Sequence, residues 1–67
     1  MKNGDHYGAI SDYTKVIEIN SNDNQAYYFR GSSKYYLNDK RGACADWRKA
    51  ANLGNTTAQD NIRLACN

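Results

Sequence analysis

The sequence predicts an all-α fold, an α-solenoid of antiparallel helix pairs, and two observations support this prediction. The segment Gly42 to Ala51 repeats the segment Gly8 to Ile17, with glycine, alanine, aspartate and lysine returning in register. The distance between the two copies lies within the period of roughly 20–50 residues that is typical of stacked repeats, in which one unit cannot bury its own apolar face. Apolar residues also recur at helical rather than strand spacing along the chain.

The first predicted helix covers residues 6–19. Its apolar residues form one helical stripe, which consists of Ala9, Ile10, Tyr13, Val16 and Ile17. The polar run 20–24 is expected to end this helix, because asparagine, serine and aspartate favour turns. Asp23 or Asn24 is expected to cap the second helix by accepting backbone N–H bonds.

The second predicted helix covers residues 24–37 and carries most of the aromatic side chains. Gly31 lies in its middle, where glycine costs about 1 kcal/mol relative to alanine. We therefore expect a neighbouring helix to approach closely at Gly31, where a side chain would block it. Asn38 and Asp39 are expected to form the following turn.

The third predicted helix covers residues 40–53 and repeats the apolar stripe of the first. Gly54 is expected to end it, because glycine readily adopts the positive φ that follows many helices. The fourth predicted helix covers residues 56–66, with Thr56 or Thr57 as its cap. It buries one side only, as a terminal helix does, through Ala58, Ile62, Ala65 and Cys66.

The two cysteines are expected to be neighbours. An antiparallel hairpin that turns near Gly54 brings Cys44 opposite Cys66, since each helix advances about 1.5 Å per residue. In a reducing cytoplasm they would remain thiols that pack as small apolar groups, and a disulfide is the alternative under oxidation. A zinc site would need two further soft ligands and is not expected.

A helix–turn–helix unit of about 34 residues resembles the tetratricopeptide repeat, whose pattern is W-x₂-L-G-x₂-Y, then A-x₃-F, then P. The pattern falls on Tyr27, Arg30, Gly31 and Lys34, then on Ala43, Trp47 and Asn55, with Ala9, Tyr13 and Ser21 in an earlier partial copy. The departures are Arg30 for leucine, Lys34 for tyrosine, and Ser21 and Asn55 for proline.

The resemblance implies about one and a half repeats plus a C-terminal capping helix in a single domain, residues 1–67. The second helix of a partial repeat is 6–19, the full repeat is 24–53, and the capping helix is 56–66. The end of the chain is similar to the C-terminal closure of many bacterial repeat arrays.

Members of this family bind peptide segments of other proteins on an inner wall that the first helix of each repeat lines. The resemblance implies a protein–protein interaction module in which the helix 24–37 supplies this wall for a protein or peptide partner. The expected binding face consists of Gln25, Tyr28, Phe29, Ser32, Tyr35 and Tyr36. Tyrosine suits such a face because it combines a large contact area with a polar tip. For each single tyrosine, packing against a neighbouring helix is the alternative.

Two other functions stay open. A nucleic-acid-binding α-solenoid would use Arg30 and Lys34 together with the tyrosines, although a net charge of +2 makes nucleic acid the weaker expectation. A self-assembling structural module would use the helix 6–19, whose apolar edge lacks a first helix to cover it. A homodimer through this edge is the simplest closed form, and its residues are Ala9, Tyr13 and Val16.

We expect no enzymatic activity, cofactor or metal site. His6 is the only histidine, and the chain has no glycine-rich phosphate loop. No run approaches the ~18 apolar residues of a membrane-spanning helix, so membrane insertion is not expected. Met1 and Lys2 precede polar residues rather than the apolar core of a signal peptide, which predicts a soluble, cytoplasmic protein.

Overall fold

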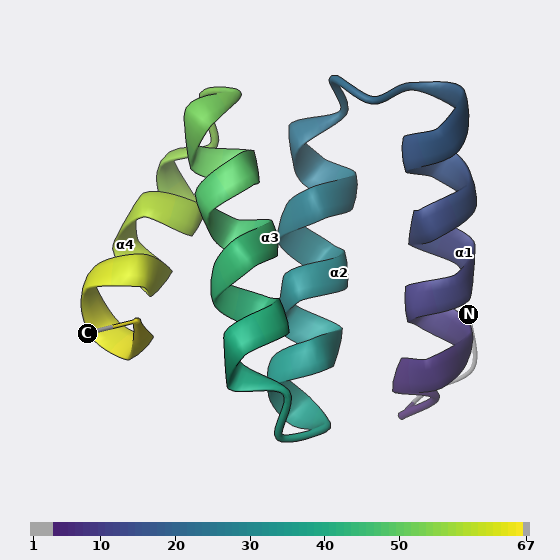
Figure 1. Cartoon of the computed structure of the whole chain (residues 1–67), viewed down its shortest axis with the longest axis horizontal. Coiled ribbons are helices and arrows are strands. Elements are labelled where there is room, and N and C mark those ends of the chain that lie inside the picture. The colour runs from purple at the N-terminus through teal and green to yellow at the C-terminus, as the bar shows by residue number, and fades with distance from the viewer. Residues whose placement is uncertain (1–3, 67) are drawn as a thin grey trace.

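Four helices follow one another along the chain in a computed structural model that describes residues 4–66. They are α1 (His6–Ile19), α2 (Asn24–Tyr36), α3 (Lys40–Asn52) and α4 (Thr56–Ala65), and no strand occurs within the described range. Consecutive helices run in opposite directions, and each packs against the next one in sequence (Figure 1). The predicted all-helical fold with packed neighbouring helices is thereby confirmed.

The predicted helix bounds are correct for α1 and extend one residue too far for the other three helices. The residues wrongly included are Leu37, Leu53 and Cys66. Each of them is a C-cap, whose N–H still donates to a helix carbonyl while its own backbone has left the helical conformation. Gly54 directly follows Leu53, the C-cap of α3, and has the positive φ, 100°, that was predicted for the residue ending this helix.

Acidic and amide side chains cap the helices. Asp23 caps α2, which selects one of the two predicted candidates. The predicted threonine caps of α4 are wrong, because the Asn55 side chain accepts the Ala58 N–H at 2.8 Å. Asparagine is the stronger N-cap, and it lies one residue before Thr56.

The turns that lead into α1 and α3 have the same construction. Gly4 has a φ of 82°, and Asn38, which lies one repeat period later, has a φ of 67°. The next residue is an aspartate in both turns, and it accepts a glycine N–H of the first helical turn at 2.9 Å. The sequence period is therefore also a period of backbone conformation. Residues 1–3 and residue 67 lie outside the described range.

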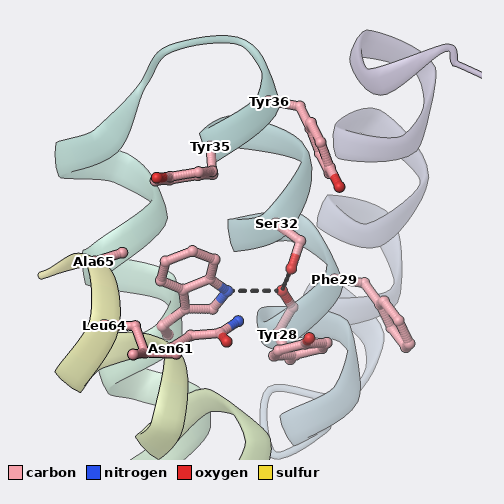
Figure 2. Close-up of a pocket in the computed structure, with 9 residues that line it drawn as sticks. Tyr28, Phe29, Ser32, Tyr35, Tyr36, Asn61, Leu64 and Ala65 are labelled. Carbon is pink, nitrogen blue, oxygen red and sulfur yellow. Dashed lines mark hydrogen bonds between the residues drawn. The ribbon is translucent and has the colours of Figure 1, made fainter.

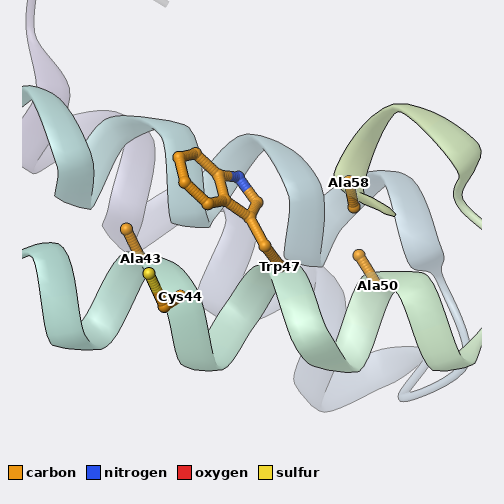
Figure 3. Close-up of a cluster of buried hydrophobic side chains, with 5 residues drawn as sticks. All are labelled: Ala43, Cys44, Trp47, Ala50 and Ala58. Carbon is orange, nitrogen blue, oxygen red and sulfur yellow. The ribbon is translucent and has the colours of Figure 1, made fainter. Parts of the chain in front are cut away.

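Small side chains around one tryptophan form the core. Trp47, Ala43 and Ala50 on α3 are buried together with Ala58 on α4 (Figure 3). A Cβ added at Gly31 would lie 2.9 Å from Cδ1 of Trp47 and 3.0 Å from the carbonyl oxygen of Ala43. The prediction of a close helix approach at Gly31 is confirmed, because α2 can meet α3 here only without a side chain.

A disulfide joins Cys44 on α3 to Cys66 at the end of α4, with the two Cα atoms 5.8 Å apart. The predicted proximity of the two cysteines, and with it the register of α4 on α3, is confirmed. Ala58 is the buried residue of α4, and Ile62 and Ala65 are partly buried against the core. The disulfide therefore adds a covalent bond at the end of a helix that already packs on α3 along one side.

Reducing the disulfide is expected to lower the free energy of unfolding by about 3 kcal/mol. The bond closes a loop with a sequence separation of 22 residues, and a loop of this length removes about that much chain entropy from the unfolded state. Urea unfolding followed by circular dichroism, with and without a phosphine reductant, measures the difference. The Cys44→Ala/Cys66→Ala variant is the control and should not respond to reductant. An unchanged wild-type midpoint would contradict the expectation.

Candidate functional site

An open groove of about 470 Å³ lies between α2 and α4. Trp47 of α3 lines it as well, with only 3% of its surface exposed, and forms its floor. In Figure 2 the Tyr28 and Tyr35 rings of α2 and the labelled side chains of α4 lie around the groove, and the rings of Phe29 and Tyr36 are directed toward α1. The lining residues from α2 are Tyr28, Phe29, Ser32, Tyr35 and Tyr36, and those from α4 are Asn61, Leu64 and Ala65.

Five of the six residues of the predicted binding face lie in this groove, and Gln25 is exposed outside it. Residue spacing indicates the shared face of a single helix only, so the contributions of α3 and α4 to the groove were not predicted. Leu64 gave a usable signal, because it is a leucine that lies off the buried stripe of its helix. It is 82% exposed, so its side chain lies at the surface beside the groove.

Large exposed apolar side chains gather around the groove. Phe29 and Tyr35 are each 45% exposed, and Tyr36 is 73% exposed. Together with Leu64 they border one concave region. Contiguous exposed apolar surface of this kind marks interaction sites, whereas apolar side chains scattered singly do not.

Hydrogen bonds fix the floor of the groove. The carbonyl oxygen of Tyr28 accepts the Trp47 Nε1–H at 3.2 Å and the Ser32 hydroxyl at 3.0 Å, which ties α3 to α2 (Figure 2). The Tyr35 ring lies with its centroid 5.5 Å from that of Trp47. Tyr28 and Tyr35 therefore both line the groove and pack against neighbouring residues of the fold. A role in binding and a role in packing, the two alternatives for these tyrosines, are compatible.

Aromatic side chains of α1 support the rings of α2 at one border of the groove. Tyr13 stacks on Phe29 with centroids 5.6 Å apart, and His6 stacks on Tyr36 at 4.8 Å. The single histidine is thus part of an aromatic pair. These contacts restrict the rotation of two exposed rings, which reduces the entropy that a ligand would otherwise have to remove.

The two cations of α2 lie away from the groove and converge on one carboxylate. Arg30 donates from Nε and Nη2 to the two oxygens of Asp46, both at 2.8 Å, and Lys34 Nζ lies 3.1 Å from Oδ2. Arg30 also donates to the Thr14 hydroxyl of α1 at 3.2 Å. The Asp46 side chain is 8% exposed. Its hydrogen bond raises the pKa of Arg30 above its ordinary value, so the guanidinium remains charged.

A second concave region lies beside the disulfide. It is lined by Cys44, Cys66 and three exposed cations of α3, which are Lys40, Arg41 and Arg48.

Within residues 4–66, no group of three histidine, cysteine or acidic side chains is placed to hold a metal ion. No helix in that part of the chain is both long and apolar enough to cross a membrane.

The residues of the predicted self-association edge differ in their exposure. Ala9 is 1% exposed, so it belongs to the interior rather than to an uncovered edge, which corrects this part of the prediction. Tyr13 is half-buried against Phe29. Val16 is 38% exposed, and Ile19, which the prediction did not include, is 89% exposed.

Comparisons of the chain with protein-family models, curated proteins and solved structures found no match.

Proposed function

We propose that this chain is a protein–protein interaction module whose groove binds a peptide segment of a partner protein. The observation that carries the proposal is the gathering of Phe29, Tyr35, Tyr36 and Leu64 around one concave surface over Trp47. Aromatic side chains around a dehydrated centre are typical of the residues that dominate binding energy at protein interfaces.

The uncharged lining of the groove indicates which class of peptide side chain it favours. None of the lining residues is charged, and they offer aromatic faces, hydroxyl groups and the amide of Asn61. A charged side chain entering the groove would lose hydration without gaining an ion pair. The partner segment should therefore present apolar or aromatic side chains, with its backbone or neutral polar groups hydrogen-bonding to the tyrosine and asparagine tips.

A tetratricopeptide-type solenoid of about one and a half repeats with a capping helix is part of the same proposal. It is supported by the sequence period that α1 and α3 share, by the recurring turn geometry and by the close contact of Gly31 with Ala43. The groove lies between α2 and α4, the two helices that occupy first-helix positions in that scheme.

The proposal is tested with peptides selected from a displayed random library on the full chain. A synthetic copy of one selected peptide is then titrated against wild type, Leu64→Ala and Tyr36→Ala. Each variant should bind about tenfold more weakly, which corresponds to about 1.4 kcal/mol for the loss of one large apolar contact. Both side chains are largely exposed, so the circular dichroism spectrum should not change.

Tyr7→Ala is the matched control for Tyr36→Ala, because it removes an equally exposed tyrosine from α1, outside the groove. It should bind the peptide as wild type does. A library that yields no binder, or a peptide that binds both groove variants with wild-type affinity, would refute the proposal. Selected sequences rich in acidic residues would also contradict the neutral chemistry expected of the ligand.

The nucleic-acid alternative has lost the cations first assigned to it, since Arg30 and Lys34 are paired with Asp46. The observation that keeps it open is the group of exposed cations Lys40, Arg41 and Arg48 beside the disulfide. Single-stranded RNA binding through this region would weaken steeply with salt. Fluorescence anisotropy with a labelled oligonucleotide at two salt concentrations distinguishes it, because peptide binding in the uncharged groove should depend little on salt.

A further inference from the structure

The outer side of α1 carries an exposed acidic and apolar surface. Asp12, Val16 and Ile19 follow each other at steps of four and three residues, which places them on one side of the helix. All three are exposed. Among the described residues, Asp12 has no ion-pair partner. This surface is separate from the groove, and the three residues define the outer face of α1.

The corresponding face of α3, which contains Asp46, is covered by α2. The contacts of α2 with this face are therefore a guide to what the outer face of α1 could bind. Asp46 lies one repeat period after Asp12, and on α3 it is 5% exposed because α2 packs over it. The helix α2 meets this carboxylate with Arg30 and Lys34, which are four residues apart and therefore on one side of α2. Two cations on one helix thus recognise one aspartate on its neighbour.

The chain also enters α1 and α3 through the same turn. The positive φ at Gly4 and Asn38, followed by a capping aspartate, sets the same start for both helices. Asp12 consequently has the same position within α1 as Asp46 has within α3. The two faces differ in their cover, because no described helix buries this side of α1. They also differ in their apolar residues, since Val16 and Ile19 stand where α3 has Ala50 and Leu53.

We propose that the outer face of α1 binds an amphipathic helix that carries arginine and lysine four residues apart, with both cations directed to Asp12. Val16 and Ile19 contact the apolar residues of that helix. A second copy of α1 fits less well, since it would bury two Asp12 carboxylates in one interface to which the outer face contributes no cation.

The test uses a synthetic peptide with the sequence of residues 23–37, which carries both cations at the required spacing, and the full chain labelled with ¹⁵N. Amide shifts are followed as the peptide is titrated to millimolar concentration. The shifts should map to Asp12, Val16 and Ile19. Asp12→Asn should weaken binding about tenfold, because a charge-assisted hydrogen bond lost from an interface costs on the order of one decade of affinity.

Glu18→Gln is the matched control. It removes the same charge from the same helix, but six residues on from Asp12, where the side chain points to another side. The Glu18→Gln variant should bind the peptide as wild type does. A peptide with glutamine at both cationic positions should bind wild type and Asp12→Asn equally weakly.

Three results would overturn the proposal. One is the absence of binding, and another is a shift map confined to the groove. The third is an Asp12→Asn variant that binds as tightly as Glu18→Gln. Sedimentation equilibrium of the free chain completes the test, since a dimer that Asp12→Asn strengthens would mean that a second copy occupies this face.

Discussion

Replacing Asp46 by alanine is expected to lower the free energy of unfolding by about 3–5 kcal/mol. The substitution leaves the Arg30 guanidinium and the Lys34 ammonium without their shared partner in a site where the carboxylate is 8% exposed. Removing one side of a buried ion pair costs this much when the remaining charges stay largely desolvated, and the Arg30 and Lys34 side chains are only 18% and 23% exposed. A chain of this size has a total stability of about 3–10 kcal/mol, so the variant should be largely unfolded or marginally stable in thermal melts.

Asp12→Ala is the matched control for this effect. It changes the same residue type at the same register position, but on an exposed helix face, and surface substitutions usually change stability by less than about 0.5 kcal/mol. Equal losses for both variants would contradict the assignment of Asp46 as a buried partner. Replacing all three charged residues by apolar ones should restore much of the stability, because whole buried ion networks are often replaceable in this way.

The pH dependence follows from the direction of the Arg30 shift. The hydrogen bond with Asp46 raises the pKa of Arg30 in the folded state. The resulting stability is complete below the unfolded pKa and is lost only as the pH rises through the raised folded value. The contribution of Arg30 is therefore constant around neutral pH, and a loss of stability there would need another group.

Local features of the fold could be predicted from the sequence because local physics determines them. Helical periodicity, turn-forming residues and the missing side chain at Gly31 give the helices and one close approach. The proximity of Cys44 and Cys66 follows from antiparallel packing with equal rise along both helices, whereas the disulfide itself was only the alternative to two thiols. Each of these predictions depends on neighbouring residues or on a single pair of adjacent helices.

Burial of polar groups could not be predicted in the same way. Asp12 and Asp46 are the same residue at the same point of the repeat, yet the first is exposed and the second is buried. Only the presence of a neighbouring helix distinguishes them. Arg30 and Lys34 looked like departures from a repeat pattern when each was considered alone, and their common partner on α3 explains both.

The groove was predicted for the α2 wall but not for its opposite wall. The α2 face follows from the spacing of its aromatic residues, whereas Leu64 and Asn61 join the site only because α4 runs alongside α2. Both helices are antiparallel to α3, so the C-terminal half of α4 lies near the C-terminal half of α2. Gln25 shares the helix face but lies near the start of α2, away from this wall.

Replacing Trp47 by alanine is expected to cost about 3–5 kcal/mol and to abolish peptide binding in whatever fraction remains folded. The indole is 3% exposed and lies against Gly31, where α2 and α3 approach closely. It also donates a hydrogen bond to the Tyr28 carbonyl. Truncating a buried aromatic side chain removes its transfer free energy and leaves a cavity. The loss is concentrated here because the remaining core residues are mostly alanines, which cannot move to fill the space.

Trp47→Phe separates packing from hydrogen bonding. It keeps an aromatic ring in the floor and should cost only about 1–2 kcal/mol, since the Tyr28 carbonyl retains its bond from Ser32. Unfolding must be followed by circular dichroism, because Trp47 is the only tryptophan and both variants lack its fluorescence. Leu64→Ala, on the rim of the same groove, should reduce peptide affinity with little change in stability. If Trp47→Ala were no more destabilising than Leu64→Ala, the indole would not be the centre of the core, and the groove would lack the rigid floor that its binding of a peptide requires.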